Sequence, residues 1–145
     1  MSWQTVAVFD VQGEPKGQPR PRAFVRNGHA SVYDAGTAEG WKAQIALAAH
    51  PFLPASPLEG PVKLTAAFFF PRPARLMRKK DPEGAVLHTA KPDADNALKA
   101  VMDCLTQIGM WHDDSQVCAT IVEKYYAAKA QRPGAVIQIF QEVKA

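Results

Sequence analysis

The sequence has few cysteines and no long apolar segment, and both shortages exclude classes of protein. Its two cysteines, Cys104 and Cys118, form no CxxC pair and are too few for a structural zinc site, so we expect reduced, buried thiols. No apolar run approaches the roughly 20 residues that a membrane-spanning helix needs. The N-terminus also lacks the basic start and apolar stretch of a signal peptide. These absences favour a cytoplasmic protein.

The length sets the domain organisation. A chain of 145 residues is expected to form one compact domain, residues 1–145, because no length is left for a second core. The hydrophobic fraction of 47% is ordinary for a globular protein and sufficient for a packed core. The 9 glycines and 12 prolines are too few for a disordered chain, so the prolines should mark loops.

Charge is distributed unevenly along the chain although the net charge is only +3. Two segments carry basic residues without any acid, whereas acids gather at residues 93–114. The basic residues considered for nucleic-acid contact are Lys16, Arg20, Arg22, Arg72, Arg75, Arg78, Lys79 and Lys80. Cationic segments together with an acidic cluster suggest a polyanion held around a metal site. Solvated surface loops are the alternative for the basic segments.

Hydrophobic periodicity predicts an α+β fold. Two-residue alternation indicates strands and a 3.6-residue repeat indicates helices. Strands are expected at 3–11, 62–70, 116–129 and 135–143, a short strand or hairpin near 29–33, helices at 38–50 and 93–107, and a long basic loop at 71–90. Thr37 is the expected N-cap of the first helix. The elements predict a mixed sheet of about four to five strands with two main helices.

Two aspartates mark the start of the second predicted helix. Pro92 suits a helix start, so Asp93 and Asp95 fall in or just before its first turn. One interpretation is that they only cap the helix and complement its dipole, for about 0.5–1 kcal/mol each. Lys99 lies four residues after Asp95 and therefore on the same helix face. Its alternative role is a surface ion pair with Asp95 or Asp103.

A second acidic pair, Asp113-Asp114, follows the helix at the entrance of a predicted strand. Three clustered carboxylates require a counter-charge, and Mg²⁺ supplies it because it prefers a few carboxylate oxygens while retaining waters and binding phosphate oxygens. Asp114 reaches Asp93 and Asp95 only if its strand starts beside the N-terminus of the helix. The sequence leaves that geometry open.

Three motifs together resemble the RusA family of Holliday-junction resolvases. They are Lys91-Pro-Asp-Ala-Asp-Asn-Ala-Leu-Lys99, Met102-Asp-Cys-Leu105 and Trp111-His-Asp-Asp-Ser-Gln-Val117, preceded by the proline- and arginine-rich segment Gly17-Gln-Pro-Arg-Pro-Arg22. A lone Asp-x-Asp would be unspecific, whereas its combination with Asn96, Lys99 and the later acidic pair is specific.

The resemblance implies a two-fold homodimer that cleaves four-way junction DNA symmetrically in recombination and repair. It implies Mg²⁺ as cofactor, with Mn²⁺ as an alternative, and a bacterial or phage origin. It assigns metal binding to Asp93, Asp95 and Asp114 and an essential catalytic role to Lys99. Asp113 is expected beside these ligands rather than among them, and Asp103 is expected as a partner of Lys99.

Two other functions remain open from the residues alone. The chain could be a basic DNA-binding module with an incidental acidic helix, which predicts salt-sensitive DNA binding without cleavage. It could also be a nucleotide-sugar enzyme that holds a metal-bound diphosphate with Asp93 and Asp95. Against the latter, the chain is short for a nucleotide-binding domain and has no glycine-rich phosphate loop.

Overall fold

The computed structural model describes residues 2–18, 22–26, 29–33 and 38–144, with only the backbone described for 22–26 and 29–33. The strands are β1 (Ser2–Gln12), β2 (Arg22–Arg26), β3 (His29–Tyr33), β4 (Val62–Phe70), β5 (Val86–Leu87), β6 (Val117–Tyr126) and β7 (Gly134–Val143). The helices are α1 (Glu39–Ala49) and α2 (Ala94–Gln107), with short 3-10 turns at His50–Phe52, Ala74–Leu76 and Asp114–Gln116. Within this part of the chain, no helix is both long and apolar enough to cross a membrane.

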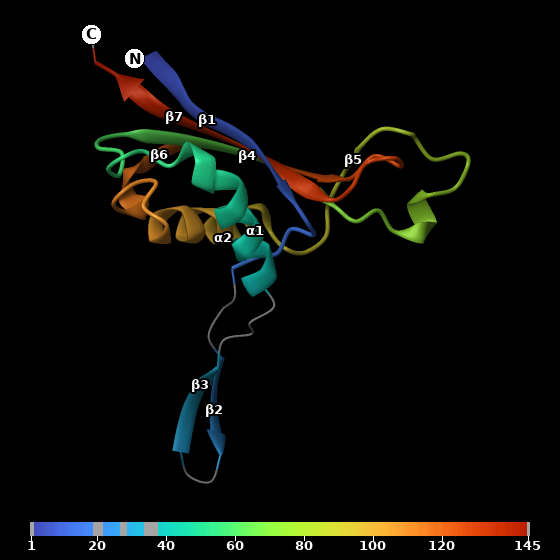
Figure 1. Ribbon diagram of the computed structural model, residues 1–145. Helices are drawn as coiled ribbons and strands as arrows, with labels where there is room; N and C mark the ends of the chain where they lie inside the picture. The colour runs from blue at the N-terminus through green and yellow to red at the C-terminus, as the bar shows by residue number, and fades with distance from the viewer. Residues whose placement is uncertain (1, 19–21, 27–28, 34–37, 145) are drawn as a thin grey trace.

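Five strands form one mixed sheet in the order β1-β7-β4-β6-β5, which confirms the predicted α+β fold. Strands β1, β7 and β4 pair antiparallel, whereas β4 and β6 pair parallel. The two helices lie together against one face of the sheet (Figure 1). A separate two-stranded hairpin, β2–β3, extends away from the sheet on the side of the helices (Figure 1).

The core forms where the helices meet the sheet. Alternation in β4 turns every second side chain toward the helices, so that Leu64 and Phe68 are fully buried. Helix α2 contributes Val101 and Leu105 from its apolar face. Met102 on the same helix is only half-buried.

The connection β4–α2–β6 fixes the direction of α2. Because β4 and β6 run parallel, the helix between them must run back along the sheet. Its N-terminus therefore lies where β4 and β6 end, and its C-terminus lies where β6 begins. Two hydrogen bonds agree with this direction: Lys124 near the end of β6 donates to Pro92 O, and Thr106 in the last turn donates to Asp114.

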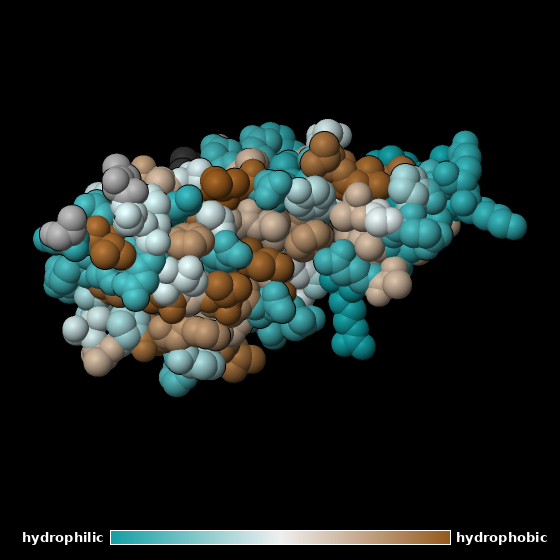
Figure 2. Space-filling model, turned by 90° about the horizontal axis from the view of Figure 1, so that it is seen from above, coloured by the Kyte–Doolittle hydropathy of each residue, from teal (hydrophilic) through white to brown (hydrophobic). Residues whose placement is uncertain are grey.

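Among the described residues, no helix covers the opposite face of the sheet (Figure 1). Seen from this side, apolar side chains lie along the middle of the molecule with hydrophilic residues around them (Figure 2). Ile121 is 51% exposed, and the rings of Phe69 and Tyr125 stack with centroids 5.4 Å apart.

Three expectations about local structure need correction. The loop predicted at 71–90 contains β5, which pairs with the end of β6. The N-cap position of α1 belongs to Ala38, and the expected cap Thr37 lies outside the described residues. Cys104 is buried as predicted, but Cys118 is exposed because it lies on β6, whose outer edge is largely uncovered.

Candidate active site

Asp93 and Asp95 lie at the N-terminus of α2, as the sequence predicted. Asp93 is the N-cap residue, with an extended backbone at φ −64° and ψ 155°, and Asp95 lies in the first turn. The Asp93 side chain forms no capping hydrogen bond with the helix. The helix-cap interpretation therefore does not account for this carboxylate, although Asp95 remains placed to complement the helix dipole.

Asp93 forms an ion pair with Lys91. The Lys91 ammonium lies 3.0 Å from one carboxylate oxygen of Asp93 and 3.1 Å from the other. Both side chains are exposed, so this pair contributes little to stability. Asp93 and Asp95 are two exposed carboxylates at one helix end, and Mg²⁺ in proteins is typically held by one or two carboxylates together with waters and substrate phosphates.

Lys99 is exposed one turn after Asp95, on the face that the sequence predicted. The expected Asp103–Lys99 pair is wrong. Asp103 instead accepts a hydrogen bond of 2.6 Å from Lys42 in α1, and it also accepts one from Gln107. The ammonium of Lys99 is consequently not engaged by Asp103 and is available to a ligand at the helix N-terminus.

Asp114 lies at the other end of α2. Its carboxylate accepts a hydrogen bond from Thr106 in the last turn of the helix, and the indole of Trp111 donates to the same hydroxyl at 2.7 Å. Thirteen residues separate Asp93 from Thr106, which at 1.5 Å per residue is about 20 Å. Among the described residues, no group of three His, Cys, Asp or Glu side chains could hold a metal ion. One copy therefore does not bring Asp114 to Asp93 and Asp95.

The neighbours of Asp114 have local structural partners. Asp113 caps the 3-10 turn Asp114–Gln116: it accepts from Ser115 N at 2.9 Å, while the Gln116 side chain accepts from Asp113 N. The hydrogen bonds from Ser115 lower the pKa of Asp113, which stays ionised as a cap. His112 contacts Glu59 at 2.8 Å on the surface.

The segment before the hairpin packs directly on the N-terminus of α2. Gln18 N donates to Asn96 O at 3.2 Å, and the Gln18 side chain reaches Asp103 at 3.4 Å. A Cβ added at Gly17 would collide with the Asn96 amide and lie 3.1 Å from Pro92 Cβ. The sequence indicated this segment as a basic DNA-contacting loop but gave no sign that its glycine lets it approach the carboxylates.

We expect Gly17→Ala to impair cleavage of DNA by moving the N-terminus of α2. The new methyl group displaces the Asn96 amide at the end of its side chain and lies 3.1 Å from Pro92 Cβ, which must move by a few tenths of an ångström. Overpacking of this kind costs about 1 kcal/mol in unfolding free energy. A small shift of Pro92 beside Asp93 is expected to lower the cleavage rate by on the order of 10-fold. Urea unfolding and cleavage assays measure the two effects.

Gly84→Ala is the matched control, because no atom lies within 4 Å of a Cβ added there. It is expected to keep the wild-type rate and stability. Equal losses in both variants would show that the contact at Gly17 has no special role.

Lys124 and His88 contact or belong to the loop that leads to Asp93, and the sequence did not indicate either residue as part of the site. The His88 imidazole stacks on Phe70 with ring centroids 4.1 Å apart and contacts the Tyr126 ring at 4.6 Å. Burial, and then the charge of Lys124, lower the pKa of His88. Lys124 resembled an ordinary strand lysine, so no sequence signal distinguished it.

The first basic segment is only partly described. Lys16 forms an ion pair of 3.2 Å with Glu14. Arg20 lies outside the described residues, and Arg22 begins β2 without a described side chain. Their DNA-binding roles stay predictions.

The second basic segment divides into residues that hold the loop and residues that are exposed. The Arg72 guanidinium donates to Leu76 O and Gly84 O at 2.8 Å each and to Pro82 O at 2.6 Å, so its hydrogen-bonding capacity is used within the loop. The remaining contacts are Arg75 over the Tyr126 ring and Arg78 with Asp81, while Lys79 and Lys80 are exposed. Lys79 and Lys80 are therefore the better placed of the predicted phosphate contacts.

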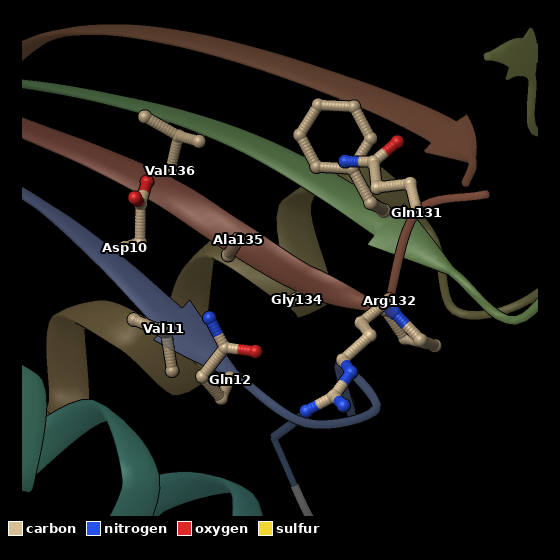
Figure 3. Close-up of a pocket in the computed structure, with 10 residues that line it drawn as sticks. Asp10, Val11, Gln12, Gln131, Arg132, Gly134, Ala135 and Val136 are labelled. Carbon is tan, nitrogen blue, oxygen red and sulfur yellow. The ribbon is translucent and has the colours of Figure 1, made fainter. Parts of the chain in front are cut away.

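A pocket of about 290 Å³ at the junction of β1 and β7 includes no predicted site residue. Asp10, Gln12, Gln131 and Arg132 provide its polar groups (Figure 3). Asp10 and Arg132 point to opposite sides of the strands in this view (Figure 3). The polar groups do not converge, so the N-terminus of α2 remains the candidate active site.

Comparison with known proteins matches most of the chain to one family. The family model described as "Endodeoxyribonuclease RusA" matches residues 12–140. The chain is also 35% identical over 124 residues to "Uncharacterized protein YqaN" of Bacillus subtilis (strain 168), which covers 82% of this chain and 87% of that protein. The matched region includes α2, both acidic pairs and every strand of the main sheet in whole or in part.

Proposed function

Because the chain belongs to the RusA family of endodeoxyribonucleases, we propose that it is a Mg²⁺-dependent homodimer that resolves Holliday junctions by paired, symmetric cleavage in DNA recombination and repair. The observation that carries the proposal is the exposed pair Asp93 and Asp95 with Lys99 one helical turn away. These residues are the metal ligands and the phosphate-binding cation of the proposed site. Mn²⁺ would suit the same oxygen donors.

Asp114 supports a shared site. Since Asp114 lies about one helix length from Asp93 in the same copy, a three-carboxylate site requires the Asp114 of a partner subunit. A two-fold dimer would then contain two equivalent sites, each built from both copies. Within one copy, the hydrogen bond from Thr106 holds Asp114 at the C-terminal end of α2.

The outer edge of β6 offers a surface for such a dimer. In the described part of the chain, β4 occupies one edge of β6, and on the other edge β5 pairs only with Tyr125 and Tyr126, so the outer edge of β6 before Lys124 has no strand beside it. Unpaired edges readily pair with another chain. The half-exposed side chain of Ile121 supplies apolar surface at the middle of this edge.

Antiparallel pairing of two such edges would bring the start of one β6 beside the end of the other. Asp114 begins the 3-10 turn that leads into β6, and Lys124 near the end of β6 is bonded to Pro92. The partner's Asp114 would therefore approach the loop that carries Asp93. This arrangement brings together in two copies the carboxylates that one copy separates.

The side chains divide the chemistry of phosphodiester hydrolysis among themselves. Mg²⁺, when bound, would supply a Lewis acid and an activated water. Asp93, Asp95 and the partner's Asp114 would orient the metal through oxygen ligands. Lys99 would place its ammonium against the phosphate and stabilise the charge that develops there.

The proposal predicts cleavage of a synthetic four-way junction in the presence of Mg²⁺ and none when EDTA removes the metal. A linear duplex of the same sequence should stay intact, because two related sites match the symmetry of a junction. Denaturing electrophoresis of end-labelled strands measures both. Metal-independent, salt-sensitive binding without cleavage at any Mg²⁺ or Mn²⁺ concentration would instead identify a DNA-binding module.

A further inference from the structure

Lys124 connects β6 to the loop that leads to Asp93. Its half-buried side chain lies on the helix-facing side of the strand, and its ammonium donates to Ala90 O and Pro92 O at 2.8 Å each. Hydrogen bonds from a charged donor are stronger than those between neutral groups. Pro92 immediately precedes Asp93, so one side chain fixes the backbone directly before a proposed metal ligand.

The rest of the loop is attached to the same end of β6. Val86 and Leu87 pair with Tyr126 and Tyr125, and His88 N donates to Lys124 O at 3.1 Å. After His88, the loop has no regular secondary structure until α2 begins. Lys124 thus holds the loop through its backbone at His88 and through its side chain up to Pro92.

The titratable groups next to Lys124 do not bind its ammonium, which donates to the two backbone carbonyls. The adjacent His88 ring is buried between Phe70 and Tyr126, where its lowered pKa keeps it neutral. The neighbouring carboxylate of Glu123 accepts from Tyr125 on the other face of the sheet, at 2.6 Å. Neither group competes for the ammonium.

We propose that Lys124 is a positioning residue of the active site: it holds Pro92, and through it the Asp93 carboxylate, in the orientation that binds the metal. This inference rests on the proposed function. A group that orients a metal ligand without touching the metal typically changes metal affinity by about 10–100-fold when it is removed. Junction binding in the absence of metal should not depend on it.

The test compares Lys124→Met with Lys124→Arg in the full-length protein. Methionine retains much of the apolar stem and removes the charge and the donors, whereas arginine retains both. We expect Lys124→Met to raise the Mg²⁺ concentration for half-maximal junction cleavage by about 10-fold or more. Mn²⁺ titration followed by electron paramagnetic resonance should show the same weakening without reference to activity. Lys124→Arg should recover part of the affinity.

Lys129→Met is the matched control. The ammonium of Lys129 also donates to a backbone carbonyl, Arg78 O at 2.7 Å, but in the 71–85 region away from Asp93. Its removal should leave the metal titrations unchanged. An equal shift in both variants, or an unchanged metal affinity in folded Lys124→Met, overturns the inference.

If Lys124→Met does not fold, Lys124→Gln decides, because it keeps N–H donors on a shorter, neutral side chain. Weakened Mn²⁺ binding by that variant supports the inference, and wild-type binding overturns it. Failure of the unmodified protein to cleave a junction with any metal would overturn the proposed function itself. A cleaving wild type with unaffected Lys124 variants overturns only the role of Lys124.

Discussion

A mixture of the Asp95→Asn and Asp114→Asn variants is expected to cleave one strand of a four-way junction that neither variant cleaves alone. Each substitution removes a charged metal ligand and should lower cleavage by on the order of 10³-fold. The folded protein should tolerate both changes, because asparagine has nearly the same size and both positions are at least partly exposed. Binding to the junction should persist.

The recovery follows from the separation of the two carboxylates along α2. If each site takes Asp95 from one subunit and Asp114 from the other, a mixed dimer has both defects in one site and an intact second site. If a site were complete within one subunit, every site of a mixed dimer would be defective. A junction with one labelled strand per arm distinguishes the resulting nick from paired cleavage.

The mixture of Asp93→Asn and Asp95→Asn controls for subunit exchange. Both residues belong to the same end of the same helix, so each site of that mixed dimer lacks one ligand and no activity should return. An Asp95→Asn and Asp114→Asn mixture that stays as inactive as its parents, after exchange has been verified by size-tagged subunits, would contradict the shared site.

The elements of the fold could be predicted because their signals are local. The 3.6-residue repeat predicted α2 and the two-residue alternation predicted β4, and the structure buries Val101 and Leu105 of the helix and Leu64 and Phe68 of the strand. Asp93 and Asp95 were likewise placed correctly at the start of α2, since proline and aspartate favour a helix N-terminus.

The partners of the site residues could not be predicted because they depend on how distant elements pack. Periodicity does not show whether β4 and β6 pair parallel, and that pairing places Asp114 at the C-terminus of α2. The short link between Gln107 and Asp114 was the available signal, since it keeps Asp114 near the end of the helix. Asp103 pairs with Lys42 instead of the predicted Lys99, because α1 packs on α2.

Lys99→Met is expected to lower junction cleavage by about 10²–10³-fold while the protein keeps its fold. The reason is that its ammonium lies on the exposed face of α2 one turn from Asp95, where it can stabilise charge on the reacting phosphate. Because the side chain is exposed, its loss should change the unfolding free energy by no more than about 0.5 kcal/mol. Cleavage under single-turnover conditions and urea unfolding measure the two quantities.

Lys42→Met provides the opposite pattern and therefore the control. Lys42 is half-buried and bonded to Asp103 at 2.6 Å, so its removal should cost about 1–2 kcal/mol of stability. Cleavage by the folded fraction of that variant should remain near wild type, since Asp103 faces α1 rather than the carboxylates at the helix N-terminus. Full cleavage by folded Lys99→Met would exclude the lysine from the site. A stability loss in Lys99→Met equal to that of Lys42→Met would show that Lys99, too, serves the packing of α2 rather than the phosphate.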